Sequence, residues 1–480
     1  MKKLFDKYKT MNIQAKAAIW FVLCSILQKG ISFITVPIFT RVLTSNEYGT
    51  YSLYLSWLQI LTVLTSLYLA NGVFNNAMVK FDYDRDKFTS VMQGLTLTIT
   101  GSIFIVFLFF QGLWERVLGL SSTIIILMFI EMLVTPALSF WSGRQRFEYQ
   151  YKKLVTVTLI QSIANPVLGL IAVSLSSEHA TARIASIVFV ELLVCGSIMI
   201  LQFRKGKVFF DKYYWKYALG LAVPLLPHYL SGIILNQGDR IMIEKMVGRS
   251  AVAFYSVAYS IGMLVQIITN AIFHSFNPWV YQKIKSSDYN GIAKTTNILL
   301  GFIAGVSFVL MLCSPELVLI FGSKEYASAA YVIPPVAASV YFIFLYNILA
   351  IPQFYYEKTQ FLMYASLSAA LANIILNYIF IKTFGFIAAG YTTLVCYVLY
   401  SLGHAIISKR VFQRFIANGK LFDLKFIFIL SVLVILVGSG CSFLFDMWYV
   451  RYIILIVTFI IIVWNREKLM SKVCKLKGAP

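Results

Sequence analysis

Long runs of apolar residues, separated by short polar segments, dominate the pattern along this chain. Each run has about the 20 residues that a helix needs to cross the hydrocarbon core of a bilayer. Windows of that length predict about fourteen transmembrane helices. The expected spans are 17–39, 48–71, 88–111, 118–141, 153–175, 180–203, 213–237, 250–275, 290–313, 327–350, 358–381, 386–408, 424–445 and 447–464.

The composition narrows the fold class further. Of the 480 residues, 59% are hydrophobic and only 13% are charged. A soluble protein has too little polar surface at this composition to cover its apolar side chains. The sequence therefore predicts an all-α polytopic membrane protein.

The Lys and Arg residues lie mainly in the segments between the spans, and their distribution predicts the topology. The chain has 41 Lys and Arg against 20 Asp and Glu. Because cation-rich loops alternate with poor ones, this excess orients the chain in a membrane and does not indicate a nucleic-acid partner. We expect both termini in the cytoplasm, residues 1–10 as a basic tail, and the first span as an uncleaved signal-anchor. The cation-rich segments are 80–87, 144–153, 204–216, 283–294, 409–420 and 466–477.

The short connections exclude several classes of function. None is much longer than roughly 20 residues, which is too short for a catalytic domain, so we expect no enzyme and no catalytic residues. The phosphate-binding loop of ATP-driven motors, G-x-x-x-x-G-K-[ST], does not occur. Six cysteines lie far apart without a C-x-x-C pair. We therefore expect no disulfide framework, no metal site and no cofactor.

A weak internal repeat predicts two related halves. "RVLTSNEYGTYSLYLS" (Arg41–Ser56) aligns with "KMVGRSAVAFYSVAYS" (Lys245–Ser260), and the matches include Tyr51 with Tyr255. Each stretch joins an expected outer loop to the next helix, and six crossings separate them. Such halves are related by an axis along the membrane normal. The expected parts are residues 1–203, residues 204–408, and two further helices with a basic tail in 409–480.

Lys29 is the most unusual residue of the first span, because it lies near the midpoint. Water is about 15 Å away there, farther than a lysine side chain reaches. A central lysine costs about 2.5–3.5 kcal/mol and usually faces a bundle interior or a water-filled cavity. Lys29 is therefore a candidate substrate-binding residue. The alternative is a structural ion pair with Glu131 or Glu191.

Glu131 and Glu191 lie in the middle of the fourth and sixth expected spans. Carboxylates inside membrane helices commonly belong to proton relays or bind coupling cations, so both are candidates for ion coupling. Each alternatively satisfies a neighbouring hydroxyl, an amide or Lys29. The expected coupling ion is H⁺ or Na⁺.

The seventh expected helix reads "LAVPLLPHYLSGIILNQGDRIMI". Pro224 and Pro227 remove backbone donors, so they predict an irregular segment and are hinge candidates. His228, Asp239 and Arg240 are candidates for binding substrate in a cavity. Packing is the alternative role for His228, and a local salt bridge is the alternative for Asp239 with Arg240.

Two other places carry polar or helix-breaking residues. Pro166 follows Asn165 in the fifth span and is a third hinge candidate. Asn373 and Asn377 lie one turn apart in the eleventh span and are further candidates for the cavity. Their default explanation is hydrogen bonding between helices.

Two stretches resemble a known family. "TVPIFTRVLTSNEYGTYSL" and "VPLLPHYLSGIILNQGDRIMIEKMVGRSAVAFYSVAYSIG" look like the Wzx-type polysaccharide-exporter branch of the multidrug/oligosaccharidyl-lipid/polysaccharide (MOP) superfamily. One departure is at Ala253 and Phe254, where the family usually has glycine. The resemblance implies two pseudo-symmetric six-helix bundles around a central cavity, with two added C-terminal helices.

The resemblance also implies a function. Family members are thought to move undecaprenyl-diphosphate-linked oligosaccharides, for capsule, O-antigen or another surface glycan, across a bacterial cytoplasmic membrane by alternating access. Lys29 would then attract the lipid diphosphate. Membrane lipids, and a glycan polymerase and glycosyltransferases of the same pathway, are the expected partners.

Three other functions remain as alternatives. A drug/cation antiporter shares the architecture, and a peptidoglycan lipid-precursor flippase differs only in its substrate. A glycan polymerase or ligase generally needs a sizeable outer loop with catalytic Arg or His, which this chain lacks.

Overall fold

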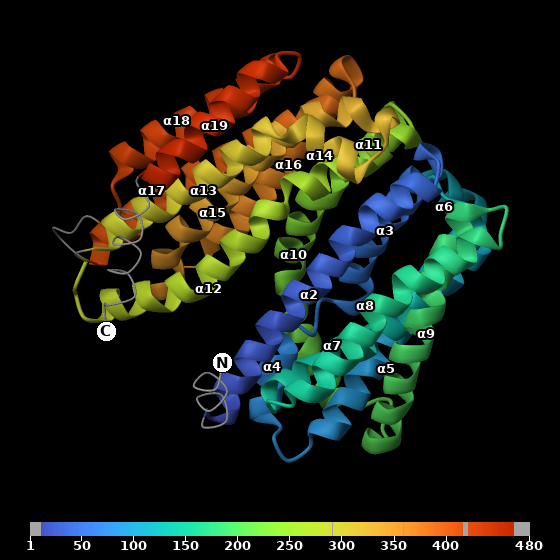
Figure 1. The fold of residues 1–480 in the computed structure, drawn as a ribbon. Helices are drawn as coiled ribbons and strands as arrows, with labels where there is room; N and C mark the ends of the chain where they lie inside the picture. Colours follow the sequence, from blue (N-terminus) through green and yellow to red (C-terminus); the bar gives the residue numbers. More distant parts are fainter. Residues whose placement is uncertain (1–10, 290, 359, 416–420, 465–480) are drawn as a thin grey trace. The chain divides into compact units, whose positions relative to one another are not determined.

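A computed structural model describes residues 11–289, 291–358, 360–415 and 421–464, and these residues form helices and no strand (Figure 1). Twelve helices in the described ranges are long and apolar enough to cross a membrane. The predicted fold class, an all-α polytopic membrane protein, is therefore confirmed. The predicted basic tails, 1–10 and 466–477, lie outside the described residues.

The chain divides into two compact units, residues 1–253 and 254–480. The boundary lies inside α11 (Arg249–Gly262). The helices of the first unit are α2 (Ile13–Val42), α3 (Ser45–Ser66), α4 (Val73–Lys80), α5 (Arg85–Phe109), α6 (Gln111–Leu118), α7 (Ser122–Phe147), α8 (Tyr151–Ser174), α9 (His179–Gly206) and α10 (Lys212–Met246).

The second unit contains eight α-helices after α11 and two short 3₁₀ helices in its described residues. Its most buried element is α15, which packs against α12, α13, α17 and α18. These elements are α12 (Leu264–Lys285), α13 (Ile292–Leu312), α14 (Ser314–Phe321), η1 (Lys324–Val332), α15 (Ile333–Tyr355), α16 (Gln360–Phe384), α17 (Ile387–Phe415), α18 (Leu424–Gly440), η2 (Cys441–Leu444) and α19 (Trp448–Trp464).

Every predicted span coincides with a helix, but two helices differ from the other twelve. α19 has only 17 residues. α3 has 22 residues and is not among the apolar spans, because Ser, Thr, Tyr and Gln interrupt it. Ser52, Ser56 and Thr65 of α3 are buried, and Ser56 donates to the carbonyl of Ser52 at 3.0 Å. Serines that bond within their own helix need no water, which lets α3 pack inside the bundle.

The structure of α10 contradicts one prediction made from its prolines. The sequence predicts an irregular segment at Pro224 and Pro227, but both lie inside one α-helix that runs without interruption over Lys212–Met246. Pro166 likewise lies inside α8. A proline removes one donor, and membrane helices tolerate this where surrounding groups accommodate the freed carbonyl. The hinge roles of the three prolines stay predictions.

The repeated stretches adopt the same local structure. In the first, α2 ends at Val42 and α3 begins at Ser45; in the second, α10 ends at Met246 and α11 begins at Arg249. Ala253 and Phe254 are helical, so the departure from the family pattern causes no break.

α10 belongs with the first unit because it packs along α3. A Cβ on Gly49 of α3 would lie 2.0 Å from the carbonyl oxygen of Arg249, the first residue of α11. Only glycine therefore fits where these two backbones meet. The compact division therefore falls after α10, whereas the predicted repeat boundary precedes it at 203/204. The grouping by pseudo-symmetry stays a prediction.

Candidate functional site

Lys29 lies on an exposed side of α2. None of the ion pairs among the described residues includes it, so it forms no structural pair with Glu131 or Glu191. Its role as a substrate-binding residue stays a prediction.

Glu131 is 6% exposed on α7 and meets a neutral donor. The hydroxyl of Tyr54 on α3, itself completely buried, donates to Glu131 Oε2 at 2.5 Å. This contact matches the alternative in which a neighbouring hydroxyl satisfies the carboxyl. The residues are far apart in sequence, so only the packing of α3 on α7 brings them together.

Glu191 of α9 is also buried and also has neutral donors. The Gln161 amide of α8 donates to Oε1 at 2.5 Å, and the Cys195 thiol donates to Oε2 at 3.0 Å. The first unit thus holds two carboxyl groups within one bundle and pairs neither with a cation among its described residues.

A polar pocket of 480 Å³ lies within the first unit, between the end of α3, the following turn, α4 and α7. We call it the hydroxyl pocket. Leu67 and Tyr68 both have positive φ, 49° and 50°, which turns the chain sharply after α3 and brings the next residues to the pocket wall. The polar lining residues are Thr62, Ser66, Tyr68, Asn71, Asn75, Thr135, Ser139, Ser142 and Arg146.

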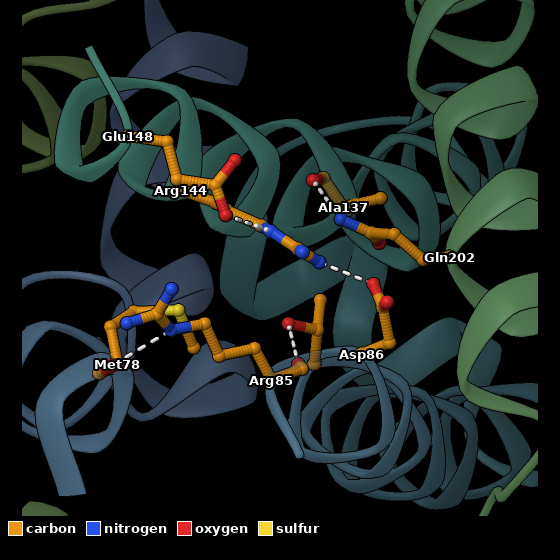
Figure 2. Close-up of polar contacts among 8 residues, drawn as sticks. Met78, Arg85, Asp86, Ala137, Arg144, Glu148 and Gln202 are labelled. Atoms are coloured by element: carbon orange, nitrogen blue, oxygen red, sulfur yellow. Dashed lines mark hydrogen bonds and ion pairs between the residues drawn. The ribbon is translucent and has the colours of Figure 1, made fainter. Parts of the chain in front are cut away.

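Arg144 and Arg146 differ in their partners although they lie two residues apart on α7. Figure 2 shows Arg144 between two carboxylates, Asp86 of α5 and Glu148. Arg146 lines the hydroxyl pocket and takes part in none of the ion pairs among described residues. The pocket therefore combines hydroxyl and amide groups with one positive charge, which has no carboxylate partner in the ranges that the structure describes.

The polar contacts around Arg144 tie several elements together at the same end of the bundle. Figure 2 also shows Gln202 of α9 donating to the carbonyl of Ala137 at 3.0 Å and Arg85 donating to the carbonyl of Met78 at 2.9 Å. These bonds join α9 to α7 and α5 to α4, and together with the contact between Arg144 and Asp86 they fix the helix from which Arg146 projects.

A second polar pocket of 310 Å³ lies between α2, α3, α8 and α9. We call it the arginine pocket, because Arg183 borders it. Two predicted residues, Glu191 and Pro166, line it as well. Sequence inspection missed both arginines: Arg146 resembles any loop cation, and Arg183 lies near the end of a span, where a cation is ordinary.

The other predicted cavity residues lie in both units. His228, Asp239 and Arg240 are on α10, where Asp239 and Arg240 are buried and Arg240 donates to the Asn236 carbonyl at 2.8 Å. Their role in binding substrate stays a prediction.

Asn373 and Asn377 are on α16 of the second unit, and both are completely buried. Asn377 donates to Asn373 at 3.0 Å, and Asn373 donates to Thr393 of α17 at 3.4 Å. This hydrogen bonding between helices is the default explanation that the sequence supplies. Within the described residues, no three His, Cys, Asp or Glu side chains cluster as metal ligands do.

Comparisons with solved structures identify the fold. The chain is similar to the lipid II flippase MurJ in its inward closed conformation, with a TM-score of 0.70 and 16% identity over 94% of this chain and 100% of that one. It is also similar to an inward-facing multidrug resistance MATE family transporter of the MOP superfamily, with a TM-score of 0.64 and 13% identity over 80% and 94% of the two chains. These two likenesses show the fold of the chain.

Sequence comparisons identify the family. A Lsg locus protein of Haemophilus influenzae is 24% identical over 373 residues, which cover 74% of this chain and 88% of that protein. A MatE family model matches residues 224–379. The model of the polysaccharide biosynthesis proteins matches residues 15–284, more than half of the chain. The resemblance to the MOP superfamily is confirmed, and the chain belongs to the polysaccharide biosynthesis protein family.

Proposed function

We propose that this protein is a flippase that moves undecaprenyl-diphosphate-linked oligosaccharide across a bacterial cytoplasmic membrane by alternating access. The family of polysaccharide biosynthesis proteins supports a glycan-related substrate. A fold similar to that of a lipid II flippase supports a lipid-linked one.

The observation that carries the proposal is the hydroxyl pocket. An apolar helical bundle has no structural need for a space of 480 Å³ lined by hydroxyls, amides and an arginine. Sugars bind through hydrogen bonds to such groups, and arginine binds phosphate through its planar fork of donors. The pocket therefore suits the glycan end of the substrate, where Arg146 would lie near a charged group of the substrate.

Lys29 has a separate role in the proposal. Its ammonium is exposed on α2 and has no carboxylate partner among the described residues. Such a cation attracts the lipid diphosphate more strongly in low-dielectric surroundings than it would in water. The remaining candidates, His228, Asp239 and Arg240 of α10 with the asparagines of α16, would contact the sugar in a cavity.

We also propose the location and the partners. The protein lies in the cytoplasmic membrane with both termini in the cytoplasm. A glycosyltransferase pathway supplies its substrate, and a glycan polymerase consumes the product on the outer face.

Complementation tests this function. In a host that lacks the gene, wild-type protein should restore surface glycan, measured by immunoblotting. Lys29→Ala should abolish export, and Arg146→Gln should lower it at least tenfold, at unchanged protein levels in the membrane. Arg116→Gln is the matched control, because Arg116 is an exposed arginine of α6 with no ion pair among the described residues.

Each alternative function has its own outcome. Normal export by Lys29→Ala removes Lys29 from the mechanism. Rescue of a strain depleted of its lipid II flippase would instead support the peptidoglycan-precursor alternative. Drug resistance conferred without any glycan export would support the antiporter.

A further inference from the structure

Arg183 of α9 is held inside the first unit by two aromatic rings. Its side chain is 3% exposed. The guanidinium carbon lies 4.1 Å from the centre of the Phe39 ring and 5.3 Å from that of Tyr51. Aromatic faces attract a guanidinium and fix its plane, so α2 and α3 hold this cation in one orientation.

The positive charge of Arg183 has no counter-ion among the described residues. Nη1 donates to the carbonyl of Asn165 at 3.0 Å and to the hydroxyl of Ser186 at 3.4 Å. Nε is buried and has no acceptor in the described part of the chain. Both bonds therefore go to neutral oxygens, whereas a guanidinium has five N–H donors and a full charge.

Two acidic side chains in this part of the first unit, Glu191 of the pocket lining and Glu47 of α3, have other partners. Glu191 is about 12 Å farther along the axis of α9, at 1.5 Å per residue, and accepts from Gln161 and Cys195. Glu47 accepts from Thr44, and it contacts His179 at 3.1 Å. Neither carboxyl group neutralises Arg183.

The space around Arg183 depends on a glycine. A Cβ on Gly169 of α8 would lie 2.4 Å from Arg183 Nη1 and 2.9 Å from Cζ of Phe39. Any larger residue would displace the guanidinium. The position of Arg183 is thus built by contacts from α2, α3 and α8 together.

The arginine pocket lies beside this cation and is lined with polar groups. Its volume of 310 Å³ is near the lower end of the range of about 300–1,000 Å³ typical for ligand pockets, so it suits a small ligand. Oδ1 of Asn165 is buried and accepts no hydrogen bond from the described residues, so a hydroxyl group of a ligand can donate to it. Further polar lining comes from Gln28, Ser32, Thr35 and Gln161.

Burying a cation without a counter-ion costs free energy. A structure that keeps such a cation is therefore stabilised when an anion binds it. Carboxylate and phosphate groups match the arginine fork, because two of their oxygens can accept parallel hydrogen bonds from it. We propose that the arginine pocket binds one small oxyanionic group, a carboxylate or a phosphate, with Arg183 as its charged partner. This inference does not depend on which substrate the protein moves. The oxyanion comes either from a free ion or from an acidic sugar.

Equilibrium binding to the purified full-length protein tests the proposal. Radiolabelled inorganic phosphate and glucuronate are titrated separately at fixed NaCl, with glucose as the neutral match for glucuronate. Wild-type protein should bind one of the two anions saturably, and glucose should not compete. Phosphate binding assigns the site to a free ion, and glucuronate binding assigns it to an acidic sugar.

Variants identify the site. Arg183→Gln should weaken binding at least tenfold, and Arg183→Lys should weaken it less. Gly169→Ala keeps the charge but displaces the guanidinium, so it should also weaken binding. Arg116→Gln, at an exposed arginine on α6, should bind as the wild type does.

An export assay on the same variants distinguishes this proposal from the proposed function. If the wild-type protein binds neither anion saturably, or if binding is unchanged in both Arg183→Lys and Gly169→Ala, the proposal is overturned even where Arg183→Gln fails to fold. Neither result alters whether the protein exports glycan.

Discussion

Two buried carboxyl groups of the first unit accept hydrogen bonds from neutral side chains. Glu131 accepts from Tyr54, and Glu191 accepts from Gln161. In contrast, Arg451 of α19 is 3% exposed and is paired with Glu316 of α14 at 2.8 Å. Carboxyl groups with neutral donors are free to exchange a proton without breaking an ion pair, which suits the proposed coupling.

The contact between Tyr54 and Glu131 predicts a non-additive double mutant. Tyr54→Phe leaves a buried carboxyl group without its donor, which should destabilise the protein by about 1–3 kcal/mol. Adding Glu131→Leu to Tyr54→Phe should recover part of that loss, because both polar partners are then gone. Thermal unfolding in detergent measures each variant. Strictly additive effects would mean that the two side chains do not interact.

A second prediction concerns Asp211, which caps α10 and lies outside the spans. Its carboxylate is 2.9 Å from Lys87 Nζ, and it accepts from the backbone N–H groups of Tyr213 and Tyr214. The hydrogen bond from Lys87 is the main cause that lowers the pKa of Asp211. A lowered pKa in the folded state contributes stability above the unfolded value, about 3.9, and loses it as pH falls through the folded pKa.

Asp211→Asn should therefore lower the unfolding temperature modestly at pH 7, since the pair is partly exposed. The difference from wild type should shrink below pH 4 and vanish in stronger acid. Melting curves between pH 3 and 7 provide the check. A difference that stays constant over this range would assign the loss to helix capping alone.

At the scale of elements, close helix contacts depend on small residues at particular positions. A Cβ on Gly94 of α5 would lie 2.0 Å from the carbonyl oxygen of Phe209, and one on Gly206 of α9 would lie 2.2 Å from Ser90 Cβ. Gly94 therefore lets the connection after α9 approach the backbone of α5, and Gly206 lets the end of α9 approach the same helix.

Gly94→Ala should therefore destabilise the protein by about 1–3 kcal/mol, as overpacking does. Gly101 lies on the same helix, and a Cβ at this position would have no neighbouring atom within 4 Å among the described residues, so Gly101→Ala is the matched control. It should be neutral or slightly stabilising, because alanine has the higher helix propensity. Thermal unfolding of the two variants compares them directly, and equal effects would contradict the close contact.

At the scale of the whole molecule, the chain forms two compact units, and the first holds the hydroxyl pocket, the arginine pocket, Glu131 and Glu191. Coupling of transport to an ion gradient would therefore act through this unit. The hydroxyl pocket and the arginine pocket have separate linings, so substrate and anion effects can be varied independently.

Collapsing an ion gradient should slow transport. In proteoliposomes loaded with lipid-linked oligosaccharide, a protonophore or a sodium ionophore should reduce flipping by wild-type protein, and Glu131→Gln should be slow but insensitive to that ionophore. A sugar-cleaving enzyme added outside measures the flipped fraction. Equal rates with and without both gradients would rule out ion coupling.

The sequence by itself determined the helices, the fold class and the family. Bilayer thickness sets the length of each apolar run, so the predicted spans coincide with helices, including α3 in spite of its hydroxyl groups. The motif after the first helix likewise depends on local sequence. In both of its copies, one helix ends and the next begins at matching positions. Such features depend on neighbours in sequence and need no knowledge of the packing.

Only the tertiary structure decided which way each polar residue faces. Lys29 is exposed, whereas Arg183, which drew no attention in the sequence, is buried between two aromatic rings. Helix rotation is set by packing against helices that are distant in sequence, and for Arg183 these are α2, α3 and α8. Hydropathy gives the length of a helix but not its rotation, so the partners of Glu131 and the two pockets emerge only when the bundle is assembled.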